Sequence, residues 1–219
     1  MNTRTETDLL GQIEIDDSKY FGIHTLRALQ NFKISNSRIS DYPLFVKSLV
    51  ITKKACALAN GDLGTIPRAK VDLIVKGCDI MLADVHKYAW YFPTDVFQGG
   101  AGTSVNMNAN EVIANRSAEI LGGKIGSKTV HPNDHVNCSQ STNDAYPTSI
   151  KLAVLLSLKD LLGAMEELKQ ALEAKAEEFA DVLKLNDEEL PVLSDFFGIT
   201  GELKTQLNHN QILLIFVRC

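Results

Sequence analysis

The sequence predicts a mainly α-helical protein built around one long helix. Apolar residues recur at steps of three and four along several stretches, and no strong alternating pattern of a β-strand accompanies them. The longest of these stretches, residues 147–183, would form a rod of roughly 55 Å at about 1.5 Å per residue. A small domain does not bury a rod of that length, so the sequence predicts a bundle of similarly long helices.

Two shorter helices are expected in the first half of the chain. The first spans about residues 43–60, because Asp41 precedes it, Pro43 suits the first helical position and Gly61 can close it. The second spans about residues 67–85, where apolar side chains follow helical spacing. These side chains are Val71, Ile74, Val75, Cys78, Leu82 and Val85.

A third helix is expected over residues 103–121, ending at Gly122. Its composition is unusual because it contains several asparagines, which are poor helix formers. They are Asn106, Asn108, Asn110 and Asn115. Short strands are expected near residues 11–15 and 126–130.

The long helix carries an apolar stripe that needs a partner. Its members are Leu158, Leu161, Met165, Leu168, Leu172, Ala176, Phe179 and Leu183. At about 1.5–3 kcal/mol each, their burial would supply roughly 12–24 kcal/mol, which rivals the whole stability of a typical domain, about 5–15 kcal/mol. After Lys184 the pattern breaks into short pieces that end in an apolar segment, residues 212–217. We therefore expect partners from other subunits or from further chain.

The composition is that of an ordinary globular protein. The 219 residues are 45% apolar and 22% charged, with a net charge of −5. No basic stripe is present, which argues against a nucleic-acid partner. The first residues lack the apolar core of a signal peptide, and no apolar run reaches the roughly 18–20 residues of a membrane span. The four cysteines form no CxxC pair, so we expect reduced thiols in a cytoplasmic protein.

Two hydroxyl-rich segments stand where helices are expected to begin. In the first, a glycine-rich turn at 98–102 precedes Thr103 and Ser104. In the second, small polar residues at 139–144 precede the long helix. The first turn of a helix has unpaired N–H groups and the positive end of the dipole, so it can hold a carboxylate. An ordinary loop with an N-cap explains each segment alone, whereas two such helix starts suit a ligand with two carboxylates.

A third polar cluster, residues 131–137, contains His131 and His135 four positions apart. That spacing invites a metal site, but Pro132 argues against an uninterrupted helix that would place both imidazoles on one face. The favoured interpretation is a turn that holds a polar network, in one version of which Asp134 sets the tautomer of a histidine.

These clusters together resemble the aspartase/fumarase superfamily. The motifs are GGAGTSVNMNANEV at 99–112, HPNDHVN at 131–137 and QSTNDAYPTSIK at 140–151. The segment FGIHTLRALQNFKIS at 21–35 is similar to the aspartate ammonia-lyase family in particular, since a fumarase would be expected to carry Gln in place of His24. The resemblance covers about residues 6–184.

The resemblance implies reversible deamination of L-aspartate to fumarate and ammonia. A base would remove a proton from the carbon next to the β-carboxylate, and hydrogen-bond donors would stabilise the resulting aci-carboxylate dianion. Thr103, Ser141 and Thr142 match residues that bind the substrate carboxylates. Asn143 matches a residue near the amino group, and Ser104 is a weaker match.

The resemblance also implies a second site, cofactors and partners. His131, Asn133 and Asp134 match a second, non-catalytic carboxylate site near the active-site entrance. No organic cofactor is implied, and a divalent metal such as Mg²⁺ would act at most as an activator. Family members form homotetramers in which several subunits build each active site around a bundle of long helices.

The chain departs from the family pattern after about Lys184. The family would continue with a Gly-Arg-Thr segment, and its later loop with the serine base has no counterpart here. We therefore expect an N-terminal helical lyase domain at 1–142, the first long helix of a central bundle at 143–184, and a tail outside the family at 185–219. On this interpretation the chain is truncated, lacks the catalytic base and is inactive alone.

Other interpretations stay open. The chain could belong to a fumarase-type hydro-lyase whose discriminating residues lie outside it. It could also be a non-catalytic protein whose apolar rod and tail dock on intact lyase subunits, or a product that folds poorly.

Overall fold

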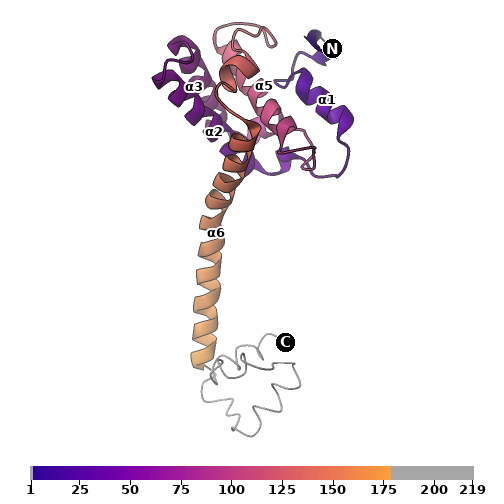
Figure 1. The fold of residues 1–219 in the computed structure, drawn as a ribbon. Helices are drawn as coiled ribbons and strands as arrows, with labels where there is room; N and C mark the ends of the chain where they lie inside the picture. The colour runs from indigo at the N-terminus through magenta and orange to yellow at the C-terminus, as the bar shows by residue number, and fades with distance from the viewer. Residues whose placement is uncertain (1, 179–219) are drawn as a thin grey trace. The chain divides into compact units, whose positions relative to one another are not determined.

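The computed structural model describes residues 2–178, and its helices confirm the predicted fold class (Figure 1). The described chain falls into two compact units, one that runs through Ser157 and one that begins at Leu158. The expectations for Phe179, Leu183 and the tail at 185–219 lie outside the described residues.

A β-hairpin opens the described chain. Strand β1 (Thr3–Asp8) pairs antiparallel with β2 (Gly11–Asp16), in a register that sets Thr3 opposite Asp16. The expected strand near 11–15 is thus confirmed, whereas β1 was not predicted because its side chains are polar on both faces. The strand expected at 126–130 is wrong: these residues form turns, and the positive φ angles of Gly126 (82°) and Lys128 (55°) are incompatible with extended chain.

Helix α1 (Ile23–Asn31) was not predicted either, and a side chain from a distant segment supports its start. The buried carboxylate of Glu111 accepts hydrogen bonds from the N–H groups of Gly22 and His24, each at 2.8 Å, and from the hydroxyl of Thr25 at 2.7 Å. Burial raises the pKa of Glu111, while these donors act in the opposite direction. Because every contact is a donor, we take the carboxylate as ionised, a negative charge at the positive end of α1.

The first two predicted helices are confirmed with small shifts. Helix α2 (Pro43–Asp62) has its proline at the start, as expected, but it continues through Gly61. The αL conformation lies at Gly64 instead, with a φ of 70°. Helix α3 (Arg68–Ala83) ends before the expected residue 85, and a short helix α4 (Val85–Ala89) follows it. A 3₁₀ turn, η1 (Ile39–Asp41), precedes α2.

Helix α5 (Thr103–Ile120) confirms the third predicted helix and is the most buried element of the first unit. It packs on α3, where Gly77 allows a close approach: a Cβ there would lie 2.7 Å from the Ser117 hydroxyl. Its asparagines are largely paired, for example Asn108 with the carbonyl of Tyr91 (2.9 Å) and Asn115 with that of Tyr20 (2.7 Å). Tertiary hydrogen bonds thus override the poor helix propensity of asparagine.

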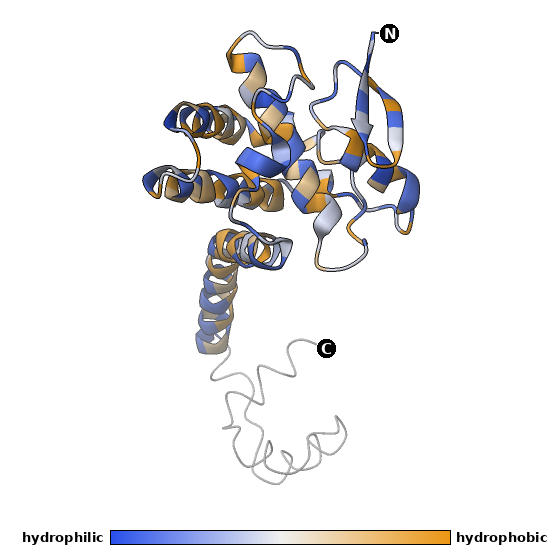
Figure 2. Ribbon diagram, turned by 45° about the horizontal axis from the view of Figure 1, so that its top comes forward, coloured by the Kyte–Doolittle hydropathy of each residue, from blue (hydrophilic) through white to orange (hydrophobic). Residues whose placement is uncertain are grey.

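The core of the first unit lies where α2, α3 and α5 meet, and α2 and α3 run side by side in Figures 1 and 2. Its fully buried side chains come from all three helices. They include Val46, Leu49, Val50, Val71, Ile74, Cys78, Met81, Val105, Val112 and Ile113.

Helix α6 (Thr142–Glu178) confirms the predicted long helix but begins five residues earlier, so that Pro147 lies inside it. Near its start it is tied to α2, because the buried Ser149 hydroxyl donates to Thr52 Oγ1 at 3.0 Å. Further along, the side chains of Leu161, Met165 and Leu168 are each more than half exposed (54%, 56% and 53%). That exposure agrees with an apolar stripe whose partner is still to be identified.

Two expectations from composition can be compared with the structure. Cys56, Cys78 and Cys138 are free thiols, and Cys219 lies outside the described residues. Within residues 2–178, no helix combines the length and the apolar character needed to cross a bilayer.

Substitutions at two glycines of the turn before α5 test the packing of α5 on α6. Gly100 and Gly102 both have positive φ (68° and 92°), but only at Gly102 would a Cβ collide with Tyr146 of α6, at 2.4 Å. We expect Gly100→Ala to lower the free energy of unfolding by about 1–2 kcal/mol from backbone strain alone. Gly102→Ala should lower the free energy of unfolding by roughly 1–3 kcal/mol more than Gly100→Ala does, because of the collision with Tyr146. Equal losses in urea denaturation would contradict the close packing of the two helix starts.

Candidate functional site

The start of α5 is capped only in part by the described side chains. Gly102, the N-cap residue, lies in the αL region and has no capping side chain. Gln98 Oε1 accepts the N–H of Val105, the third helical residue, at 3.0 Å. Thr103 is exposed and Ser104 is half-buried. The N–H groups of these first two residues have no hydrogen-bond partner among the described residues, and the helix dipole there favours an anion.

The start of α6 is capped from within. Ser141 Oγ accepts the N–H of Asn143 at 3.2 Å, so the capping interpretation is correct for Ser141. The hydroxyl hydrogen of Ser141 remains able to donate to a ligand. Thr142 is half-buried, and Asn143 and Asp144 are exposed. The carboxylate of Asp144 lies in the same first turn, so a bound anion would share the positive end of the helix with it.

The two helix starts lie against each other. Asn106 Nδ2 of α5 donates to Thr142 Oγ1 of α6 at 3.1 Å. Thr103 lies one turn before Asn106 on the same helical face. The Asn106–Thr142 bond therefore sets the first turn of α5, which carries Thr103, beside the first turn of α6, which carries Thr142 and Asn143 and follows Ser141.

A buried ammonium group fixes this junction. Lys53 of α2 is only 1% exposed, and its Nζ donates to Asn106 Oδ1 (2.6 Å), Gln140 Oε1 (2.8 Å) and Asn137 Oδ1 (3.0 Å). All three acceptors are neutral amide oxygens, one from α5 and two from the segment 137–140 before α6. Gln140 directly precedes Ser141, so this lysine connects α2 and α5 to the start of α6.

Burial lowers the pKa of Lys53 to about 8, and the nearby Cys56 acts in the opposite direction. At pH 7 the ammonium form still outnumbers the amine by about ten to one. Sequence analysis missed this residue. Helical spacing says only that Lys53 lies on α2 beside Lys54, and the three oxygens that surround it come from distant segments.

The turn at 131–137 forms a polar network, as predicted. Residues Pro132–Val136 form one π-helical turn, η2. His131 Nδ1 accepts the backbone N–H of Asp134 at 3.1 Å, and His135 Nδ1 accepts the N–H of His131 at 2.8 Å. The backbone of Asp134 thus places the proton of a neutral His131 on Nε2, while the Asp134 carboxylate lies 3.2 Å from Nδ1. Burial lowers the pKa of His135.

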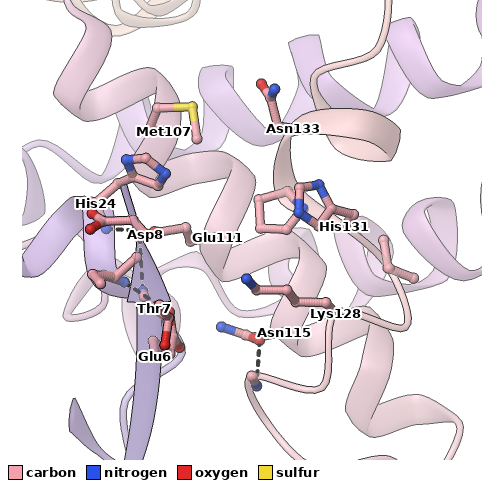
Figure 3. A pocket seen from close by; sticks show the side chains of 15 residues that line it. Glu6, Thr7, Asp8, His24, Met107, Glu111, Asn115, Lys128, His131 and Asn133 are labelled. Atoms are coloured by element: carbon pink, nitrogen blue, oxygen red, sulfur yellow. Dashed lines mark hydrogen bonds between the residues drawn. The ribbon is translucent and has the colours of Figure 1, made fainter. Parts of the chain in front are cut away.

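The second predicted site borders a small cavity of about 70 Å³ (Figure 3). Figure 3 shows the side chains of His24, Lys128, His131 and Asn133 around it. Asp134 does not line this cavity. Ser104 lines a different, open hollow together with residues of α1. His24 lines both hollows, and the cavity is further lined by Lys128; neither residue was assigned to the second site from the sequence.

Comparisons with known proteins identify relatives along most of the chain. A family model described as "Lyase" matches residues 11–186. Aspartate ammonia-lyase of Escherichia coli is 50% identical over 190 residues, which cover 86% of this chain and 40% of that protein. Aspartate ammonia-lyase of Helicobacter pylori is 48% identical over 188 residues, which cover 85% of this chain and 40% of that protein. The chain thus spans about two fifths of the length of these curated relatives.

Solved structures agree with these matches. The fumarate lyase:delta crystallin from Brucella melitensis, in native form, superposes with a TM-score of 0.79 and 50% identity, covering 84% of this chain and 41% of that chain. A recombinant class II fumarase from Schistosoma mansoni superposes with a TM-score of 0.77 and 35% identity, covering 84% of this chain and 39% of that chain.

The low pKa of Lys53 predicts a pH dependence of stability. The folded pKa of about 8 lies below the ordinary lysine value of 10.5, so between these pH values the unfolded chain binds more protons and the free energy of unfolding rises with pH. For a group this deeply buried the rise would total about 3 kcal/mol. We expect Lys53→Met to abolish this component in urea denaturation from pH 7.5 to 10.5. Lys54→Met, at the half-buried neighbour, should keep this component. Parallel profiles for Lys53→Met and the wild type would contradict the assignment.

Proposed function

We propose a function for this chain from the premise that it belongs to the lyase family, within the aspartase/fumarase superfamily. The chain binds a small dicarboxylate at the paired starts of α5 and α6. There it takes part in the reversible deamination of L-aspartate to fumarate and ammonia, as a carbon–nitrogen lyase.

One observation carries the proposal: the Asn106–Thr142 hydrogen bond holds two hydroxyl-bearing helix starts together. Each start favours an anion through its N–H groups and dipole. A dicarboxylate needs two such positions a short distance apart. The names of the relatives from Escherichia coli and Helicobacter pylori support aspartate as the substrate.

The chemistry assigned to these residues is binding and charge stabilisation. Removal of a proton next to the β-carboxylate builds a second negative charge on that group, and preorganised donors stabilise it more than they stabilise the ground state. The proposed donors are the hydroxyls of Thr103, Ser141 and Thr142, together with the N–H groups at the first helical positions that no described residue occupies, those of Thr103, Ser104 and Thr142. Asn143 would contact the amino group.

The proton acceptor is proposed to come from elsewhere in the complete enzyme. None of Thr103, Ser141, Thr142 and Asn143 carries a group that titrates near neutral pH. The described chain therefore binds the substrate in this proposal, and turnover by the chain alone is not expected.

The resemblance allowed Mg²⁺ as an activator. Residues 2–178 contain no group of three or more His, Cys, Asp or Glu side chains placed to hold a metal ion. The described donor set does not fit such an ion, and we assign it no step. The proposal needs no organic cofactor.

The proposal includes a homotetramer and a second carboxylate site. The exposed side chains of Leu161, Met165 and Leu168 support subunit packing along α6. The second site is assigned to His131 and Asn133 at the cavity of Figure 3, where Lys128 supplies a positive charge and the carboxylates of Glu6, Asp8 and Glu111 also line the wall.

A second candidate function is that of a fumarase-type hydro-lyase. The superposition with the Schistosoma mansoni fumarase favours it, because the described fold is compatible with either enzyme. Both reactions share fumarate, so the two candidates differ in whether ammonia or water is added to it.

The proposal is tested by dicarboxylate binding to the purified chain. We expect the wild type to bind fumarate in isothermal titration calorimetry, and Thr142→Val to weaken binding on the order of tenfold, because one donor to a charged group is lost. Thr148→Val, at an exposed threonine one turn and a half further along α6, should bind like the wild type.

The same preparation distinguishes the two chemistries. Fumarate and ammonium ions are incubated with the chain, and aspartate and malate are measured by proton NMR. Absence of fumarate binding by the folded wild type would refute the proposed function. Sustained formation of malate would favour the hydro-lyase, and sustained formation of aspartate would refute the view that the base lies outside the described residues.

A further inference from the structure

We infer that Lys53 is a positioning residue of the dicarboxylate site: through the side-chain amide of Asn106, it turns the hydroxyl of Thr142 into a donor toward the ligand. The inference rests on the proposed function, because it explains why the Thr142 hydroxyl of that same site faces the ligand as a hydrogen-bond donor. It concerns Lys53 and Asn106, neither of which the sequence assigned to the site.

The first step is the orientation of the Asn106 amide. An ammonium group has three N–H donors and no acceptor, so any polar atom that contacts it must be an acceptor. Asn106 Oδ1 lies 2.6 Å from Lys53 Nζ. The oxygen of this amide therefore faces α2, and its NH₂ group faces the opposite way. Chemistry alone fixes the orientation, without reference to hydrogen positions.

The second step is the hydroxyl of Thr142. The NH₂ group of Asn106 has two hydrogens, which are directed to Asn137 Oδ1 (3.0 Å) and Thr142 Oγ1 (3.1 Å). Thr142 Oγ1 is thereby an acceptor on its inner side. Its own hydrogen is directed away from Asn106, and Thr142 is half-buried at the first position of α6. The hydroxyl is thus available as a donor to a carboxylate.

The third step is the absence of a competing negative charge. Nζ of Lys53 is paired with three neutral amide oxygens, and no carboxylate among the described residues lies in salt-bridge contact with it. A carboxylate in place of Asn106 would satisfy the ammonium better, but it has no hydrogen to give to Thr142. The neutral amides satisfy the three donors of the ammonium, and Asn106 passes its donor character outward over two hydrogen bonds.

The decisive variant is therefore Asn106→Asp, which keeps the shape of the side chain and reverses its role. The new carboxylate can pair with Lys53 and accept from Thr142, so the Thr142 hydrogen turns inward. The ion pair with Lys53 is gained and the donor to Asn137 Oδ1 is lost, although that oxygen keeps its contacts with Lys53 and Asn110. We expect the melting temperature to change little, while the affinity for fumarate falls on the order of tenfold or more. If Asn106 had only a structural role, the affinity for fumarate would fall only where the melting temperature also falls. Fumarate affinity equal to that of the wild type would overturn the inference.

A readout without ligand separates this inference from the proposed function. In the folded Lys53→Met chain, NMR spectra should show changed shifts for the side-chain amide of Asn106 and the methyl group of Thr142. Lys54→Met serves as the matched control, because Lys54 is the neighbouring lysine and pairs with Asp79 instead. It should leave both signals in place.

The outcomes are distinguishable. If Asn106 and Thr142 keep their wild-type signals in Lys53→Met, the inference fails whether or not fumarate binds. If the signals shift as expected but the wild type does not bind fumarate, the inference about polarity stands and the proposed function fails. If Lys53→Met does not fold, the NMR signals of the isosteric Asn106→Asp are measured instead. An unchanged Thr142 methyl shift in that variant would show that the Thr142 hydrogen has not turned inward and would overturn the inference.

Discussion

The ammonium group of Lys53, buried among neutral amides, is the constraint on which the rest of the site depends. A buried charge is unfavourable unless its hydrogen bonds are satisfied. Here the acceptors must come from α5 and from the segment before α6, because α2 itself offers none of them. Satisfying Lys53 therefore brings together the two helix starts that carry Thr103 and Thr142. The same contact explains why α5 carries asparagine at position 106 despite its poor helix propensity.

Helix α5 carries a buried charge of its own, Glu111, near its middle. Glu111 and Lys53 of α2 each fix the start of a different helix. Glu111 receives only donors and orders the start of α1, which places His24 beside the cavity of Figure 3. Lys53 gives only donors and orders the start of α6. One helix thus supports both candidate anion sites, through a carboxylate on one side and a lysine from α2 on the other. Its burial on nearly all sides follows from these two tasks.

What could be predicted from the sequence was local, and what could not depended on distant partners. Apolar spacing located α2, α3, α5 and α6. The hydroxyl-rich helix starts suggested a carboxylate ligand, and its assignment to Thr103, Ser141 and Thr142 stays a prediction from the family resemblance. Helix α1 was missed because a carboxylate some ninety positions away caps it. Strand β1 was missed because its side chains lack apolar alternation, and turn residues with positive φ replaced the strand expected at 126–130. In the sequence Lys53 and Lys54 look alike, and only the fold buries one of them.

The capping and binding interpretations of Ser141 are compatible, and the reason is general to hydroxyl groups. A hydroxyl accepts through its lone pairs and donates through its hydrogen, so one contact leaves the other available. Ser141 Oγ accepts a hydrogen bond from the N–H of Asn143, and Thr142 Oγ1 accepts one from the side-chain amide of Asn106. Each inner contact uses the oxygen as an acceptor and leaves the hydrogen to point outward. A carboxylate, which only accepts, therefore suits these two hydroxyls as the proposed ligand.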